Sequence, residues 1–222
     1  MDPVNDGAAG PGEHDFAVTG SRLVYDGAIV ALRVDDVAMP DGSGARREVV
    51  EHHAAVVIVA VDDSDRVTLV HQYRHPLGRR LWELPAGLMD VDDEPAVDCA
   101  RRELVEEAGL TARRWSVLAD LASSPGFTDE TLRVYLAEGL EATGRPDAAD
   151  EEADLVVTSV PLAEAVRMVL AGEIINAPAV TGILALSAVR SGGGEPRSID
   201  ADAANESMST AFAERVRARS AQ

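Results

Sequence analysis

Three glutamates close together in one segment could coordinate a divalent cation. Glu103, Glu106 and Glu107 follow Arg102, and residues three or four apart share one face of an α-helix. Carboxylates this close repel each other and lower helix stability by about a few tenths of a kcal/mol per pair. A hard cation such as Mg²⁺ or Mn²⁺ would turn that repulsion into coordination. An ordinary solvated acidic face would carry the same residues, so the spacing alone leaves both interpretations open.

The residues before and after the glutamates favour the metal site. Pro95 suits the first turn of a helix, Asp93 or Glu94 can cap its N-terminus or place a negative charge there, and Gly109 suits its C-terminal end. Just upstream, residues 83–87 read Glu-Leu-Pro-Ala-Gly, a bend whose small residues could expose a backbone carbonyl to the ion. We therefore expect a bend followed by a helix that together hold a cation.

The stretch from Gly87 to Leu110 resembles the Nudix box, whose pattern is Gly, five residues, Glu, seven residues, then Arg-Glu-aliphatic-x-Glu-Glu-x-Gly-aliphatic. Residues 102–110 fit the second half at every fixed position, and Glu94 lies at the required distance upstream. One departure is present, because six residues separate Gly87 from Glu94; we interpret it as a loop insertion that leaves the ligand helix in register. The resemblance implies an α/β fold: an α/β/α Nudix sandwich with a mixed central sheet.

Segments outside the box are similar to the ADP-ribose pyrophosphatase branch of that superfamily. They are residues 72–74, 82–87 and 124–130. In that branch a proline at about this distance beyond the box marks ADP-ribose preference, and Pro125 stands there. The resemblance implies metal-dependent cleavage of ADP-ribose to AMP and ribose 5-phosphate. The alternatives are another nucleoside diphosphate derivative, such as a nucleotide sugar or a dinucleotide, or a non-catalytic nucleotide-sensing module, which would not need the intact box.

The resemblance also assigns roles to the box residues. Glu103 and Glu107 are the principal ligands of Mg²⁺ or Mn²⁺, the Ala86 carbonyl completes the protein's share, and Glu106 is a bridging or outer group. Gly87 is structural, and Glu94 pairs with Arg102 to fix the loop against the helix. The residues with a role implied by the resemblance are Ala86, Gly87, Glu94, Arg102, Glu103, Glu106 and Glu107.

A general base must take a proton from the attacking water. The resemblance points to a glutamate on a loop after the box, and Glu152 is our candidate within the acidic run 150–154; a solvated acidic loop is the alternative. Arg47 and Arg74 could clamp phosphates, and Glu83 could accept from a ribose hydroxyl. Ser124, Asp129 and Glu130 could line the terminal-ribose side. Each of these substrate contacts could instead be a surface ion pair.

Composition excludes several classes of protein. The chain has 222 residues, of which 46 % are hydrophobic, which suffices for one compact catalytic domain. Its net charge of −19 would repel nucleic acid and anionic membranes, so we expect neither as a partner. The sequence contains no lysine, so any cationic contact with phosphate must come from arginine.

Cysteine usage and the lack of long apolar segments favour a soluble cytoplasmic protein. Cys99 is the only cysteine, so no intrachain disulfide can form, and its place in the box helix favours a packed thiol over a reactive one. No signal-like N-terminal segment and no run of about 18 apolar residues is present.

Four regions follow from local patterns. Residues 1–15 resemble a disordered tail, 16–51 a small antiparallel dimerisation sheet, 52–190 the catalytic domain, and 191–222 a Gly-rich linker with an uncertain tail. Enzymes of the branch are homodimers that complete each site with the partner's N-terminal sheet, so Arg47 could act across that interface. Apolar patterns in the catalytic domain predict strands near 54–61, 67–73, 115–122, 131–137 and 155–160, and helices near 162–171 and 179–190.

Overall fold

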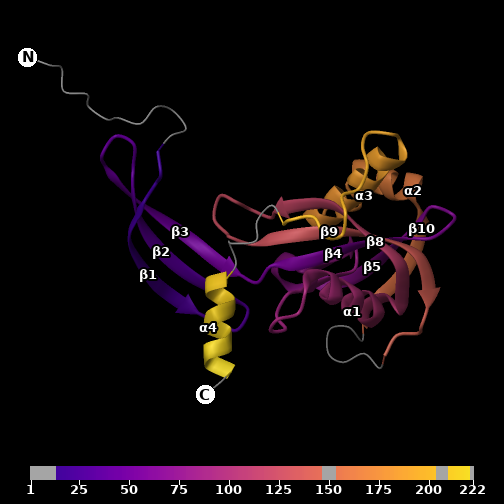
Figure 1. The fold of residues 1–222 in the computed structure, drawn as a ribbon, viewed down its shortest axis with the longest axis horizontal. Helices are drawn as coiled ribbons and strands as arrows, with labels where there is room; N and C mark the ends of the chain where they lie inside the picture. The colour runs from indigo at the N-terminus through magenta and orange to yellow at the C-terminus, as the bar shows by residue number, and fades with distance from the viewer. Residues whose placement is uncertain (1–13, 147–153, 204–209, 221–222) are drawn as a thin grey trace, which may run out of the picture.

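The small N-terminal sheet is present. In the computed structural model, which describes residues 14–146, 154–203 and 210–220, an antiparallel sheet of order β1-β2-β3 extends away from the rest of the molecule (Figure 1). Its strands are β1 (Val18–Asp26), β2 (Val30–Ala38) and β3 (Gly44–His52). Gly42 adopts φ 79° in the turn before β3, a conformation that favours glycine.

The larger sheet has seven strands and is mixed. Its main order is β10-β5-β4-β9-β8, with β6 paired to β5 and β7 paired to β4. The β4–β9 pair is parallel and the others are antiparallel. The strands are β4 (Ala55–Val61), β5 (Arg66–Arg74), β6 (Arg79–Glu83), β7 (Ala86–Leu88), β8 (Leu110–Ala122), β9 (Thr131–Ala142) and β10 (Val156–Pro161). The sequence did not predict β6 and β7, which are short and lie on either side of Pro85.

Both faces of this sheet are covered, because the apolar residues of β4 alternate between two cores. Val57 and Val59 pack in the core formed with α2 (Leu162–Leu170) and α3 (Ala177–Arg190). Val56 and Ile58 pack in the core formed with α1 (Ala96–Ala108). All seven residues of β4 are buried. The result is the expected α/β/α arrangement.

The two ends of α1 differ in how well the sequence predicted them. Gly109 takes the left-handed conformation, with φ 65°, and ends the helix as expected. The expected N-terminal cap is wrong: Pro95 precedes the helix and no side chain caps it. Glu94 binds Arg102 instead. Cys99 is fully buried, and burial raises the pKa of its thiol to about 12, as befits a packed side chain.

The chain after the glycine-rich linker returns to the fold. Arg197 bridges to Val117 of β8, and Ala201 accepts a hydrogen bond from Arg133. A further helix, α4 (Thr210–Ser220), contacts β3, and the sequence did not predict it. None of the helices in the described part of the chain has the length and apolar content needed to cross a lipid bilayer.

Candidate active site

The helix that carries the box glutamates, α1, packs directly against the bend at residues 83–87. Glu103 and Glu107 are buried on the side of α1 that contacts β7. The Ala86 N–H donates to the Glu107 carboxylate at 3.0 Å. A Cβ at Gly87 would lie 2.0 Å from the Glu103 carboxyl carbon, so only glycine leaves room for that side chain. The structure therefore brings Ala86, Gly87 and the two glutamates together.

Arg102 ties the box to its own upstream loop. Its guanidinium donates two hydrogen bonds to Glu94, each of 3.0 Å, and others to Glu103 at 2.6 Å and Glu106 at 3.0 Å. The hydrogen bonds from Arg102 hold the pKa of Glu94 below its usual value. The Glu94–Arg102 pair is the one expected from the sequence.

The donor set fits a hard cation that keeps much of its water. Among the described residues, no three histidine, cysteine, aspartate or glutamate side chains are grouped to hold a metal. Glu106 pairs with Arg102, and its side chain is 36 % exposed. Glu103 and Glu107 offer carboxylate oxygens, and Ala86 could add a carbonyl oxygen. Mg²⁺ commonly binds one or two protein carboxylates together with water and substrate phosphates. A site with two protein carboxylates suits that preference.

Two predicted substrate residues bind each other. Arg74 on β5 and Glu83 on β6 form a bidentate pair, with N···O distances of 2.9 and 2.7 Å, and Gln72 also donates to Glu83 at 3.3 Å. Glu83 is only 2 % exposed. Glu83 lies opposite Val70 in the β5–β6 ladder and Arg74 opposite Arg79, so the long Arg74 side chain reaches along the strands to Glu83. Arg74 is exposed enough to reach a phosphate while it remains paired.

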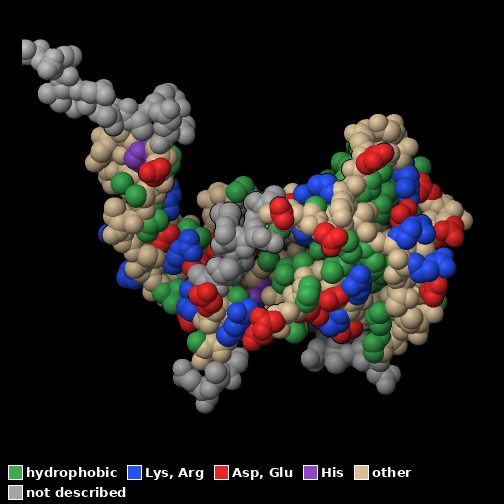
Figure 2. Space-filling model, viewed as in Figure 1, with side chains coloured by type: hydrophobic (Ala, Val, Ile, Leu, Met, Phe, Trp, Pro, Cys, Tyr) green, Lys and Arg blue, Asp and Glu red, His purple; other side chains and the backbone are tan. Residues whose placement is uncertain are grey.

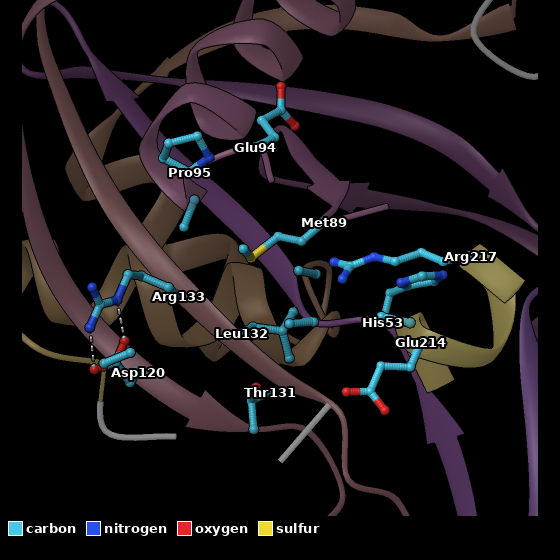
Figure 3. Close-up of a pocket in the computed structure, with 15 residues that line it drawn as sticks. His53, Met89, Glu94, Pro95, Asp120, Thr131, Leu132, Arg133, Glu214 and Arg217 are labelled. Carbon is cyan, nitrogen blue, oxygen red and sulfur yellow. Dashed lines mark hydrogen bonds and ion pairs between the residues drawn. The ribbon is translucent and has the colours of Figure 1, made fainter. Parts of the chain in front are cut away.

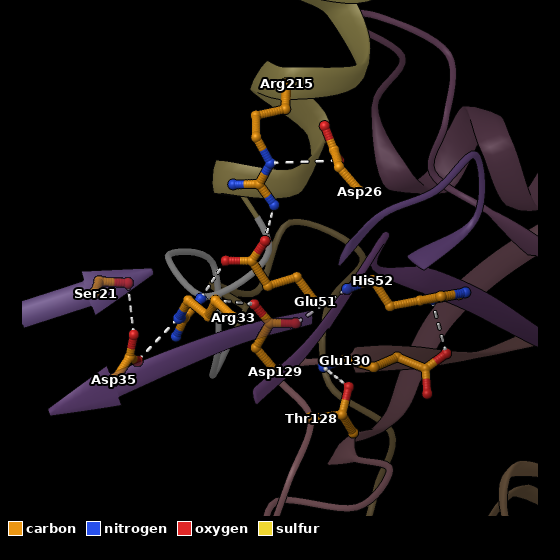
Figure 4. Close-up of polar contacts among 10 residues, drawn as sticks. All are labelled: Ser21, Asp26, Arg33, Asp35, Glu51, His52, Thr128, Asp129, Glu130 and Arg215. Carbon is orange, nitrogen blue, oxygen red and sulfur yellow. Dashed lines mark hydrogen bonds and ion pairs between the residues drawn. The ribbon is translucent and has the colours of Figure 1, made fainter. Parts of the chain in front are cut away.

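The loop between β8 and β9 contacts the small sheet through its acidic residues (Figure 4). Asp129 accepts from the His52 N–H at 3.2 Å, and Glu130 pairs with the His52 ring at 3.3 Å. The hydrogen bond with Glu130 raises the pKa of His52, although burial opposes it. Burial also acts to raise the pKa of Glu130, but the bond from His52 and one from Ser123 keep it low. Burial raises the pKa of Asp129.

The remaining predicted residues lie apart from this group or outside the described residues. The Ser124 carbonyl accepts from the N–H groups of Phe127 and Thr128, so Ser124 begins a tight turn. Arg47 is exposed on β3, where it donates to the Arg46 carbonyl at 2.9 Å. Glu152 lies outside the described residues.

Sequence reasoning missed a polar cluster that joins the small sheet to the C-terminal helix (Figure 4). Arg33 binds Asp35 at 2.9 Å and pairs with Glu51, which is only 1 % exposed. Arg215 of α4 pairs with the same Glu51 and lies 3.8 Å from Asp26. Acidic and basic side chains gather where α4 meets the sheet (Figure 2). The run Glu-Arg-Val-Arg-Ala-Arg at 214–219 was the available signal.

Comparisons with known proteins agree with this geometry. Residues 51–180 match the NUDIX domain family. The chain is 55 % identical over 190 residues to the ADP-ribose pyrophosphatase of Mycobacterium tuberculosis (strain ATCC 25618 / H37Rv), covering 86 % of this chain and 92 % of the relative. It is 37 % identical to the ADP-ribose pyrophosphatase of Bacillus subtilis (strain 168), covering 69 % and 83 %. A crystal structure of an ADP compounds hydrolase has the same fold, with a TM-score of 0.71 at 21 % identity, covering 82 % of this chain and 97 % of that one.

Proposed function

Because the chain belongs to the NUDIX family, we propose that it is a metal-dependent hydrolase that cleaves ADP-ribose to AMP and ribose 5-phosphate. The observation that carries the proposal is the close contact of Gly87 with the Glu103 side chain. Next to it, the Ala86 N–H donates a hydrogen bond to the Glu107 carboxylate. The two ADP-ribose pyrophosphatases that cover most of this chain support the choice of substrate. A sensing module would not require a backbone shaped so closely around the box carboxylates.

Glu103, Glu107 and the Ala86 carbonyl would hold Mg²⁺ or Mn²⁺. When bound, such an ion supplies neutralisation of phosphate charge and a lower pKa for water. Arg102 keeps the Glu103 carboxylate in place through its 2.6 Å hydrogen bond while it also holds Glu94. The protein itself contributes the carboxylates of Glu103 and Glu107, which are held in place and largely buried.

Substrate binding falls to arginine, since the chain has no lysine. Arg74 could bind a phosphate because its side chain is 42 % exposed, and Glu83 keeps its guanidinium oriented. Burial acts to raise the pKa of Glu130, but the hydrogen bonds from His52 and Ser123, with a smaller effect from the charge of Arg74, keep that pKa low. For the proton taken from water, Glu152 remains our candidate base.

We further propose a homodimer in which the partner's small sheet completes the site. Leu23, Val24 and Tyr25 of β1 are 43 %, 48 % and 58 % exposed, and an exposed apolar edge strand is a surface that proteins usually cover. Arg47, on β3 of that sheet, would then act on the partner's substrate. Val24→Glu should yield a monomer with a raised KM in sedimentation and kinetic measurements; an unchanged dimer would refute this interface.

The deciding experiment is a substrate panel with identification of products. With Mg²⁺ or Mn²⁺ present, ADP-ribose should have a higher kcat/KM than nucleotide sugars, dinucleoside polyphosphates or NADH, and AMP and ribose 5-phosphate should be the products. A better rate on one of the other compounds would make this a NUDIX hydrolase of a different nucleoside diphosphate derivative. No turnover of any compound would favour the sensing module. The cytoplasm, which supplies nucleotides and divalent cations, is the compartment we propose.

A further inference from the structure

A cavity of about 390 Å³ lies between the core sheet and the C-terminal helix (Figure 3). Its walls come from the starts of β4 and β9, the loop between β7 and α1, and α4. The apolar part of the wall includes Ala55, Met89, Leu132 and Ala213. A cavity of this volume falls in the range of small-molecule sites.

This cavity is distinct from the candidate active site. Glu103, Glu107 and Glu83 do not line it. Glu94 lines it but accepts hydrogen bonds from two nitrogens of the Arg102 guanidinium, Nε and Nη2. An occupant would therefore contact the loop that precedes α1 without contacting the carboxylates proposed to hold the metal.

His53 gives the cavity an unused acceptor. It lines the wall, is only 6 % exposed, and its Nδ1 has no hydrogen-bond partner among the described residues. Burial lowers the pKa of His53, so the ring is neutral at neutral pH, and its other nitrogen donates to the Met89 carbonyl. Nδ1 is thus a lone-pair acceptor. Buried polar atoms are rarely left without a partner, so a molecule carrying a donor is expected beside it.

The charges around the cavity are already matched. Arg133 binds Asp120 at 2.8 Å, and Arg217 pairs with Asp92. With Glu94 held by Arg102, Glu214 at the exposed rim is the one charged lining residue for which the described structure gives no partner. The two cations that line the cavity, Arg133 and Arg217, already have acidic partners, so a phosphate or carboxylate would have to compete with Asp120 and Asp92 for them. Met89 and the ring of His53, which meets Phe212 edge-on at 4.9 Å, favour a flat ring instead.

We propose that this cavity is a second ligand site, which takes an uncharged, largely apolar ring compound whose single N–H or O–H group donates to His53 Nδ1. Such a ligand contacts α4 through Ala213 and the loop before α1 through Met89. A bound ligand would therefore hold α4 against the loop before α1.

Indole is a suitable probe, since it is flat, uncharged and has one N–H donor, and 1-methylindole is its match without the donor. Binding to the full chain would be measured by saturation-transfer NMR and calorimetry, which do not depend on turnover. Indole should bind saturably and 1-methylindole roughly tenfold more weakly, the size expected for leaving one buried acceptor unpaired. Failure of the hydrolase assignment would leave this result unchanged.

Two variants and a control locate the site. His53→Phe keeps a ring against Phe212 but removes the acceptor, so it should abolish the preference for indole. Ala213→Trp fills the cavity from α4 and should block both probes. His75→Phe, at an exposed position, should bind like the wild-type protein. Equal binding of the two probes to the wild-type protein, indole binding that survives Ala213→Trp, or no saturable binding would each overturn the proposal, even if His53→Phe failed to fold.

Discussion

Gly87 and Glu103 are in contact in a way that excludes any side chain at Gly87, since a Cβ there would lie 2.0 Å from the carboxyl carbon of Glu103. The bend and the box helix therefore depend on each other for their positions. Gly87→Ala should displace the Glu103 carboxylate and cut kcat by roughly a hundredfold, the usual effect of an ångström-scale misplacement. Gly126→Ala, where nothing lies within 4 Å of the added Cβ, is the matched control. Full activity in Gly87→Ala would contradict the packing.

Glu103→Gln and Glu107→Gln should each lower turnover by roughly a hundredfold or more, because each removes a charged oxygen ligand and preserves shape. Circular dichroism and thermal unfolding should show that the fold persists. Asp98→Asn removes a carboxylate from an exposed position of the same helix and should leave kcat unchanged. Unfolding of the glutamine variants would instead favour a structural role for these carboxylates.

Glu152→Gln should lose far more kcat than Glu151→Gln. General-base catalysis contributes about a hundredfold to ten-thousandfold, and one carboxylate of the pair would be within reach of the water. Comparing kcat with KM at saturating metal separates loss of chemistry from loss of binding. If Glu151→Gln were the impaired variant, our alignment of the loop would be wrong by one residue; if neither were impaired, the base would lie elsewhere, at Glu106 or Glu130.

Arg215→Gln should destabilise the protein by about 1–3 kcal/mol, less than for a fully buried pair because Arg33 still neutralises Glu51. That corresponds to a fall in Tm of roughly 3–10 °C for a chain of this size. Arg219→Gln removes the same charge from α4 and should change Tm little. Among the described residues Arg219 pairs with Asp26, and both side chains of that pair are partly exposed. Equal effects of the two substitutions would refute the role of Glu51.

The His52–Glu130 pair should stabilise the fold most between about pH 4.5 and 6.5. The pKa of His52 is raised from 6.5, so its contribution is complete below that pH and is lost as pH rises through the folded-state pKa. The pKa of Glu130 is lowered from 4.5, so its contribution is present above that pH and is lost as pH falls through the folded-state pKa. The unfolding free energies of wild type and His52→Gln should therefore differ most near pH 5.5 and converge toward pH 8. A difference in unfolding free energy that does not change with pH would contradict this.

Local patterns were enough to predict the box and the core strands. The continuous apolar run of β4 and the helix end at Gly109 depend on residues close in sequence, and the resemblance to the box implied the Glu94–Arg102 pair. The Asp93 or Glu94 cap was a local prediction too, and it is wrong because Arg102 offers Glu94 a charged partner.

Contacts between distant segments could not be predicted. Arg74 and Glu83 looked like independent substrate contacts, and they pair only because β5 and β6 lie side by side and the Arg74 side chain reaches along them to Glu83. The bond between Glu51 and Arg215 depends on where two separate elements come to lie, which no periodicity encodes. The cavity beside His53 has the same origin, since residues from widely separated parts of the chain form its walls.

The partnership of Arg215 with Glu51 also has a consequence for biosynthesis. Ribosomes extend a chain from its N-terminus at roughly 5–20 residues per second, so Glu51 emerges about ten to thirty seconds before Arg215 is made. Throughout that interval the small sheet has Arg33 as the described cation beside Glu51 and Asp35, and Asp129 adds a further negative charge once it is made. The small sheet can therefore complete its ion pairs only at the end of translation. A premature stop codon before α4 would leave the buried Glu51, near the other end of the chain, without its second counterion.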